Sequence, residues 1–503
     1  MASTSALDAH QWLLNIPPIS KWESETQTFC IYASNPPNQP SLNLRIIRNI
    51  VQFHNPLVIF SLAADLNSPI SLWSTNPFHI RNSENNPFDS KTIQLLLRSI
   101  ISGVFKYESY KKTPSISVPG SLFDGDLKEI FNLAVLTLSL LVCIYEAPQG
   151  DVRRGSVEDL RLRLSSRSSR EAMKKLVRMV GSNLEQQWMR SVNLGLTNWI
   201  AENRGWNQGL SAAPSALFCH SLSTSGLWKV QLYCPIAAMA VDEDGGSATH
   251  DRRLIFSLNY QQLEGVIQFA YKVFVRENWM DVRVEVDNIR LDVNQLVSEK
   301  LMANKGYGSE EKHFPSRVSL ALTPTLQTDV ISVSVSKSSD NPIHEVGVEK
   351  GIESSFEPSS SYLGLKVSAS ETVTTSIRPW KFEQSVHGDT AVLSWFLHEG
   401  VNGREVFSRN VSKMAIIRPR SWFKNRYSSI SRPFTRHGGV IFAGDEYGES
   451  VWWKVCKEAE GKTMQWEISG RIWLTYWPNK HRTFYSETRM LEFKELMYIS
   501  LEK

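Results

Sequence analysis

Apolar residues recur at helical spacing in several segments of the first half of the chain. From Ile93 to Phe105 they return every three or four positions behind Asp89, which can cap a helix. A capping box is predicted at Ser168 and Glu171, ahead of the run AMKKLVRMV. The segment LVIFSLAADL fits either a helix or a strand. Residues 41–205 are therefore predicted to be mainly helical.

The most apolar stretch of the chain is IFNLAVLTLSLLVCIYE, which begins at Ile130. As a helix, residues 130–145 would cover about 24 Å, short of the hydrocarbon core of a bilayer, which is about 30 Å thick. Charged residues flank it on both sides, and it contains Asn132 and two hydroxyl side chains. We expect a helix buried within the protein, with a membrane-attached segment as the alternative.

From Ala216 onward the period changes to two. Short runs rich in β-branched and aromatic residues alternate with polar turns; they include LWKVQLYC, RRLIFSLNY, EGVIQFAYKVFV, DVRVEV, RVSLAL, VISVSVS and AVLSWFL. The apolar phase slips between Val286 and Ile289, which predicts a bulge near Asn288. The run TMQWEISGRIWLTYW alternates without a slip, with Gly470 on its apolar face.

These patterns predict an α+β multidomain chain. We expect an extended Pro/Asn/Ser-rich arm with one short strand, TFCIYA, in residues 1–40. A mainly helical domain would occupy 41–210, with the buried helix at 130–145. A mainly antiparallel β-sandwich or barrel-like domain would occupy 216–503.

Composition places the chain among soluble globular proteins. It has 503 residues, 42% of them hydrophobic and 21% charged, a formal net charge of +4 and a mean hydropathy of −0.25. Its five cysteines are scattered, without a CxxC pair. No signal peptide is predicted at the N-terminus, because a basic segment and a long apolar run are both missing there. We therefore expect a cytoplasmic or nuclear protein with reduced thiols.

Common catalytic motifs are missing from the sequence. Gly461-Lys462-Thr463 resembles the end of a phosphate-binding loop, but Cys456 stands where the first glycine would be and a strand follows. EAEGKT is instead predicted to be a hairpin turn between two tryptophan-bearing strands. The histidines lack metal-ligand spacing and no GxSxG is present. We predict no cofactor, no metal and no catalytic residue. We expect a non-enzymatic protein rather than an enzyme.

One acidic loop offers an alternative. FAGDEYGES places Asp445, Glu446 and Glu449 between two glycines, and half of the 16 tryptophans follow Arg378. Paired carboxylates with exposed tryptophans would suit a carbohydrate-active or other hydrolytic enzyme. The simpler interpretation is an ordinary acidic turn beside tryptophans that lie in a core.

The most uneven charge lies in residues 404–436. Guanidinium and ammonium groups alternate there with rings, in a stretch whose prolines and serines predict a loop. The predicted anion-binding residues are Arg418, Arg420, Trp422, Lys424, Arg426, Tyr427, Arg432 and Arg436. A second basic stretch holds four serines that a basic-directed kinase would modify: Ser165, Ser166, Ser168 and Ser169.

These features give one leading hypothesis and two alternatives. The leading one is a non-enzymatic intracellular interaction or adaptor protein, whose basic aromatic loop binds a phosphorylated protein, an anionic lipid surface or nucleic acid. Nucleic acid is the weakest of these partners, and peripheral membrane contact is also open. The alternatives are the hydrolytic enzyme and membrane attachment through residues 130–145. The sequence leaves the oligomeric state open.

Overall fold

The computed structural model combines helices and antiparallel sheets. The residues that it describes are 8–33, 41–49, 56–65, 69–80, 88–107, 124–148, 151–204, 218–242, 251–305, 311–336, 344–351, 370–377, 380–397, 439–443, 449–476 and 485–502. The predicted α+β class is confirmed, with strands as the larger share.

A five-stranded antiparallel sheet opens the described chain. Its order is β1-β2-β3-β4, with β5 beside β3. The strands are β1 (Thr26–Ala33), β2 (Ser41–Asn49), β3 (Leu57–Asp65), β4 (Pro69–Ser74) and β5 (Phe78–His79). The predicted strand TFCIYA is confirmed, and LVIFSLAADL is a strand. The prediction of mainly helix is wrong for residues 41–49, 57–65 and 69–74, which are strands, because helical and strand periods coincide in short apolar runs.

Six helices follow or flank this sheet. They are α1 (Ala9–Leu14), α2 (Ser90–Phe105), α3 (Asp124–Tyr145), α4 (Asp151–Leu164), α5 (Arg167–Val180) and α6 (Ser182–Arg204). Asp89 caps α2 as predicted, accepting a hydrogen bond from the Thr92 amide at 2.8 Å. The cap of α5 is Ser166 rather than the predicted Ser168.

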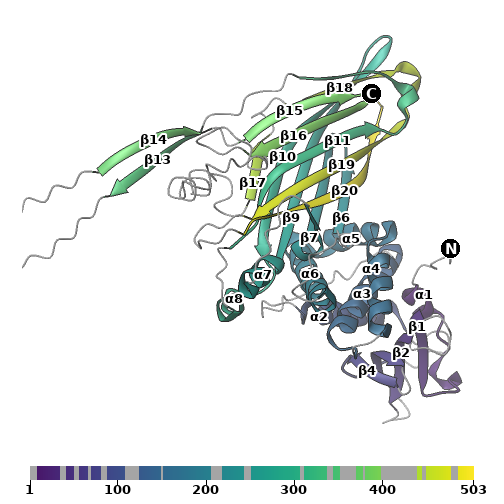
Figure 1. Cartoon of the computed structure of the whole chain (residues 1–503). Helices are drawn as coiled ribbons and strands as arrows, with labels where there is room; N and C mark the ends of the chain where they lie inside the picture. Colours follow the sequence, from purple (N-terminus) through teal and green to yellow (C-terminus); the bar gives the residue numbers. More distant parts are fainter. Residues whose placement is uncertain are drawn as a thin grey trace, which may run out of the picture.

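The central helix of this group is α3. It packs against α1, α2, α4, α5 and α6, and Figure 1 shows it among them, between the first sheet and the long strands. By length and composition, Asp126–Tyr145 could cross a membrane, but 83% of that window is buried inside the protein. The prediction of a buried helix at 130–145 agrees with this burial.

Two large antiparallel sheets form the rest of the described body (Figure 1). One has the order β12-β18-β10-β9-β7-β6 with β17 on β10, and the other β15-β16-β11-β19-β20-β8. The first contains β6 (Phe218–Thr224), β7 (Leu227–Pro235), β9 (Gln261–Val275), β10 (Trp279–Gln295), β12 (Val330–Val335), β17 (Gly439–Ala443) and β18 (Ser450–Cys456). The second contains β8 (Ala240–Val241), β11 (Phe314–Pro324), β15 (Trp380–His387), β16 (Thr390–Leu397), β19 (Thr463–Tyr476) and β20 (Glu487–Ser500).

One hydrophobic core lies between these two sheets. Trp228 of β7 and Trp453 of β18 approach Trp466 of β19, with ring centroids 6.1 Å and 6.0 Å away. All three indoles are fully buried. Gly470 of β19 leaves room for the ring of Phe493, which a Cβ atom at this position would meet. The tryptophans are therefore mainly structural, as their alternating strand predicts.

Three local predictions have different outcomes. The bulge near Asn288 is confirmed, because the register of β10 with β9 shifts between Val286 and Asn288. RRLIFSLNY is not a strand: α7 (Arg252–Asn259) forms there, capped by Asp251, and α8 (Glu299–Lys305) follows β10. EAEGKT is not a hairpin turn, because β18 and β19 lie in different sheets and the segment joins them.

A separate two-stranded ribbon stands away from the body. β13 (His344–Gly351) and β14 (Ser370–Ile377) pair antiparallel over their whole length. Among the described strands they pair with each other alone. Figure 1 shows the ribbon projecting beyond the edge of the large sheets. Along the chain it comes between β12 of one large sheet and β15 of the other.

Candidate functional site

Part of the predicted chemistry falls outside the described residues. The whole basic stretch 404–436 does so, and with it every predicted anion-binding residue. Asp445 and Glu446 of the acidic loop also lie outside. Its third member, Glu449, is described and is only 1% exposed beside β18. The structure therefore describes one buried member of this acidic loop, and the hydrolytic alternative stays a prediction.

The four serines predicted as modification sites surround the start of α5. Ser166 caps the helix and accepts from the Ser169 amide at 3.3 Å, and Ser169 donates to the Arg163 carbonyl at 2.8 Å. Ser168 is exposed, whereas Ser169 is buried. Their modification stays a prediction.

A groove of about 500 Å³ opens beside these serines, between α3, α4 and α5. Leu133, Leu136, Leu162 and Ala172 contribute apolar surface, and ion pairs occupy its rim. Lys128 contacts Asp8 at 2.6 Å, and Arg163 contacts Asp159 at 2.7 Å. Because these charges already neutralise one another, the groove does not select a charged ligand.

The contact between the helices and the seven-stranded sheet contains a buried carboxyl–imidazole pair. Glu185 of α6 lies with Oε1 3.2 Å from Nε2 of His220 on β6, and both side chains are almost fully buried. Oε2 of Glu185 accepts from the Gln231 amide at 3.1 Å. Burial raises the pKa of Glu185 to about 7 and lowers the pKa of His220 to about 4. His220 is therefore uncharged at neutral pH, whereas Glu185 changes between its protonated and ionised forms there.

This pair should give opposite pH profiles in two single variants. The stabilisation from Glu185 is complete below its unfolded pKa and is lost as pH rises through about 7, whereas that from His220 is lost as pH falls from about 6.5 toward 4. Between about pH 6 and pH 8 the two effects nearly cancel. Relative to wild type, Glu185→Gln should become more stable over this range by about 1 kcal/mol and His220→Gln less stable by a similar amount.

Urea unfolding at about pH 6 and at about pH 8 measures these changes in the free energy of unfolding. Glu171→Gln is the matched control, because Glu171 on α5 is 51% exposed, and its profile should follow the wild type. Parallel profiles for all three variants would contradict a titrating buried pair.

A second buried polar cluster joins α7, the start of β9, β20 and His313, which directly precedes β11. His313 Nε2 lies 2.8 Å from Glu487 Oε1, and its Nδ1 lies 2.9 Å from Gln261 Oε1. Arg489 donates to Glu487 at 3.1 Å and to the Asn259 side chain at 3.0 Å. Burial alone would raise the pKa of Glu487, but Arg489 and His313 hold it well below its ordinary value. The buried carboxylate is thus a cross-link between elements distant in sequence.

Metal chemistry has no support in the described part of the chain. No group of three or more His, Cys, Asp or Glu side chains there is arranged to hold an ion. The two buried pairs above were missed by sequence reasoning, because each joins residues from different elements. A lone histidine flanked by Cys219 gave no sign that Glu185 would face it.

Comparison with known proteins gives structural matches only. No protein-family model and no curated protein matches the chain. Clostridium perfringens delta-toxin has a TM-score of 0.23 at 10% identity, covering 57% of this chain and 90% of the toxin. The Clostridium perfringens NetB toxin in its membrane-inserted form has a TM-score of 0.17 at 9% identity, covering 56% and 94%. A structure described as a pore forming protein has a TM-score of 0.16 at 9% identity, covering 56% and 88%.

This comparison contradicts the leading hypothesis from the sequence. The structures that it names are pore-forming proteins and toxins, and none is an intracellular adaptor. The prediction of a cytoplasmic or nuclear interaction protein is therefore corrected as wrong. The assignment of anion binding to residues in 404–436 is not tested by this comparison and stays a prediction. At these TM-scores and identities, the likeness itself assigns neither a fold nor an activity to this chain.

Proposed function

We propose that the protein acts at lipid bilayers and inserts the β13–β14 ribbon into them. The observation that carries this proposal is a two-stranded ribbon that projects from the body (Figure 1) and pairs with none of the other described strands. An isolated two-stranded hairpin is at best marginally stable in water. Within the described part of the chain neither edge of the ribbon pairs with another strand, and open edges favour further strand pairing.

The register of the ribbon supports insertion. Val346 is paired with Thr375, and Val348 with Val373, so these positions share one face. Glu345 and Glu349 occupy the alternate positions of β13, paired with Ser376 and Thr372. The valine face ends at Lys350, which is paired with Glu371. The middle of the ribbon thus has the alternation of apolar and polar positions that is typical of strands facing lipid on one side and water on the other. Spanning would require ribbons from several copies to close, because an open sheet edge is not tolerated in hydrocarbon.

In this proposal, the membrane contact does not use α3. The helix is the apolar centre of the N-terminal layers, and exposing it to lipid would require its five neighbouring helices to separate. Membrane attachment, the sequence alternative at 130–145, is therefore kept as a function but moved to the ribbon.

We further infer a division into an N-terminal unit and a sandwich. The supporting observation is that the main hydrophobic clusters divide near residue 218. One cluster is drawn chiefly from residues 9–200 and the other from 219–501. The proposed boundary lies between residues 210 and 216, with the two large sheets packed face to face. Residues 9–31 join the first cluster, so the predicted arm of residues 1–40 is not kept as a separate unit.

Dye labelling along β13 tests the insertion. In a Cys30→Ser, Cys456→Ser background, single cysteines at positions 345, 346, 348 and 349 would carry an environment-sensitive dye. With phosphatidylcholine vesicles, we expect increased emission at 346 and 348 and little change at 345 and 349, because apolar positions would enter the acyl layer.

A release assay accompanies the labelling. Vesicles loaded with a self-quenched dye should leak when wild-type protein is added. The double variant Val346→Asp, Val348→Asp should still bind the vesicles but should not release the dye. Equal emission at all four positions, together with intact vesicles, would rule out insertion through this ribbon.

A further inference from the structure

The outer face of the seven-stranded sheet has a cluster of rings and cations, which we call the tip surface. It comprises Lys272, Phe274, Trp279, Arg283, Trp452 and Lys454. They come from β9, β10 and β18, at the end of the sheet where β9 turns into β10. α7 directly precedes β9 and so lies at the opposite end of this strand from the β9–β10 turn (Figure 1). All six residues are half-buried or exposed.

The rings of the tip surface are held by stacking and by cations. Phe274 and Trp452 stack with centroids 5.9 Å apart and planes at 18°. The Arg283 guanidinium carbon lies 5.0 Å from the Trp452 ring, and Lys454 Nζ lies 4.9 Å from the Trp279 ring. Such contacts orient the side chains on a surface where water would otherwise leave them mobile.

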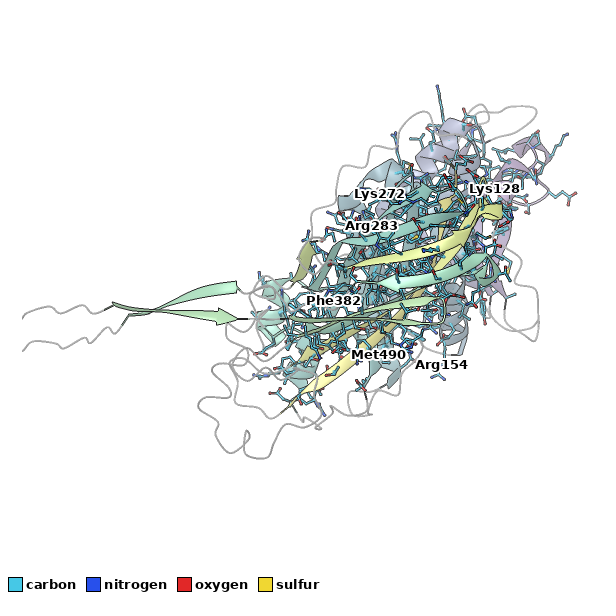
Figure 2. All side chains as sticks on the ribbon, turned by 90° about the horizontal axis from the view of Figure 1, so that it is seen from above. Lys128, Arg154, Lys272, Arg283, Phe382 and Met490 are labelled. Atoms are coloured by element: carbon cyan, nitrogen blue, oxygen red, sulfur yellow. The ribbon has the colours of Figure 1, made fainter. Side chains whose placement is uncertain are left out.

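Strand register explains this grouping. Arg283 is paired with Trp452 on one side and with Lys272 on the other, and Figure 2 shows Lys272 and Arg283 close together on neighbouring strands. The intervening β10 positions, Val282 and Val284, are buried in the core. Alternation therefore directs one set of side chains inward and leaves the other set for an outside partner.

Acids balance part of this positive charge. Asp281 accepts from the Trp279 indole at 3.0 Å and from Arg276 at 3.1 Å, and Glu285 pairs with Arg283. The remaining excess comes from Lys272 and Lys454. Two lysines give only about 2 kcal/mol of attraction to an anionic surface. Aromatic rings at the headgroup level, with charges of both signs, instead match a zwitterionic headgroup layer.

We infer that the tip surface is where the protein docks on phosphatidylcholine-type bilayers, its lysines meeting lipid phosphates and its rings lying among the headgroups. This inference rests on the proposed membrane function and adds the surface and lipid class that precede insertion. It places first contact on the rigid sheet, separate from the ribbon.

Vesicle flotation with the full-length protein tests the inference. Trp452→Ala with Phe274→Ala should weaken binding to phosphatidylcholine vesicles at least about tenfold, equivalent to about 1.4 kcal/mol. Tyr498→Ala is the matched control, because Tyr498 is an exposed aromatic of β20 (39% exposed), and should bind as wild type. Circular dichroism checks that each variant is folded. If the double alanine variant is unfolded, the double variant Lys272→Glu, Lys454→Glu replaces it, and we expect the same loss of binding to phosphatidylcholine vesicles.

The outcomes separate the two proposals. If the tip variants bind vesicles as well as the wild type does, the docking role of the tip surface is wrong and the ribbon proposal still stands. Binding that appears only with anionic lipid would overturn the zwitterionic assignment. If wild-type protein neither binds vesicles nor releases their contents, the proposed function itself fails. Loss of binding in the tip variants, with binding retained in the ribbon aspartate variant, would support both.

Discussion

Replacing Trp466 with alanine should lower the free energy of unfolding by about 3–5 kcal/mol, as large-to-small changes in a packed core do. The indole is fully buried and lies against one tryptophan of the facing sheet at 6.1 Å and another at 6.0 Å. Its removal would leave a cavity lined by Trp228 and Trp453, which belong to different strands and cannot both collapse into it.

Urea unfolding followed by circular dichroism measures this loss. Trp466→Phe should cost less than the alanine change, because it keeps a ring between the sheets. Leu326→Ala is the surface control, since Leu326 is 53% exposed, and should stay within about 0.5 kcal/mol of wild type. A Trp466→Ala protein as stable as this control would contradict a shared core between the sheets.

Arg489→Ala should be comparably destabilising, by about 3–5 kcal/mol, because it leaves the buried Glu487 carboxylate without its main counter-charge. The Arg489 side chain is 3% exposed and that of Glu487 is 5% exposed. The change also leaves the Ile236 carbonyl and the Asn259 side chain without their donor, each at 3.0 Å.

An ion pair on β19 and β20 provides the matched control. Arg471 and Glu492 are 61% and 55% exposed, so Arg471→Ala should cost less than about 1 kcal/mol. Adding Glu487→Gln to Arg489→Ala should recover part of the loss, because the remaining group is then neutral. If the buried and exposed arginine variants were equally stable, the polar cluster would not be a structural cross-link.

Features encoded within one segment could be predicted from sequence. The phase slip near Asn288 lies entirely in the alternation of β10, and a bulge is the direct consequence of such a slip. The burial of α3 was predicted from the charged flanks of residues 130–145 and the polar side chains within them. The length argument did not hold, because the helix runs from Asp124 to Tyr145 and is long enough to cross a membrane.

Segments with mixed periods were harder. In α7, Leu254 and Leu258 are buried at helical spacing, but the run is short enough to pass for a strand. The deciding signal was Asp251, whose carboxylate accepts from the Arg253 and Leu254 amides at 3.0 Å and 3.3 Å. A cap thus outweighed β-propensity.

The candidate sites depended on strand order, which a single sequence does not reveal. Phe274 and Trp452 stack because β9 and β18 flank the same strand, β10, although the two residues are far apart in the chain. Sequence reasoning favoured the 404–436 stretch because its charge and rings are contiguous. A surface assembled from three strands has no contiguous signal, so the tip surface went unpredicted.

The last strand of the six-stranded sheet also has a consequence for how the chain is made. Through β20, Trp228 bonds the Tyr498 carbonyl across 270 residues, and Arg170 pairs with Glu495 across 325. The six-stranded sheet cannot be completed until β20 has been synthesised, and pairings this distant in sequence form slowly. Until β18 and β19 have been synthesised, β10 and β11 each have an open edge, so the unfinished chain is the form most prone to aggregation and most dependent on chaperones.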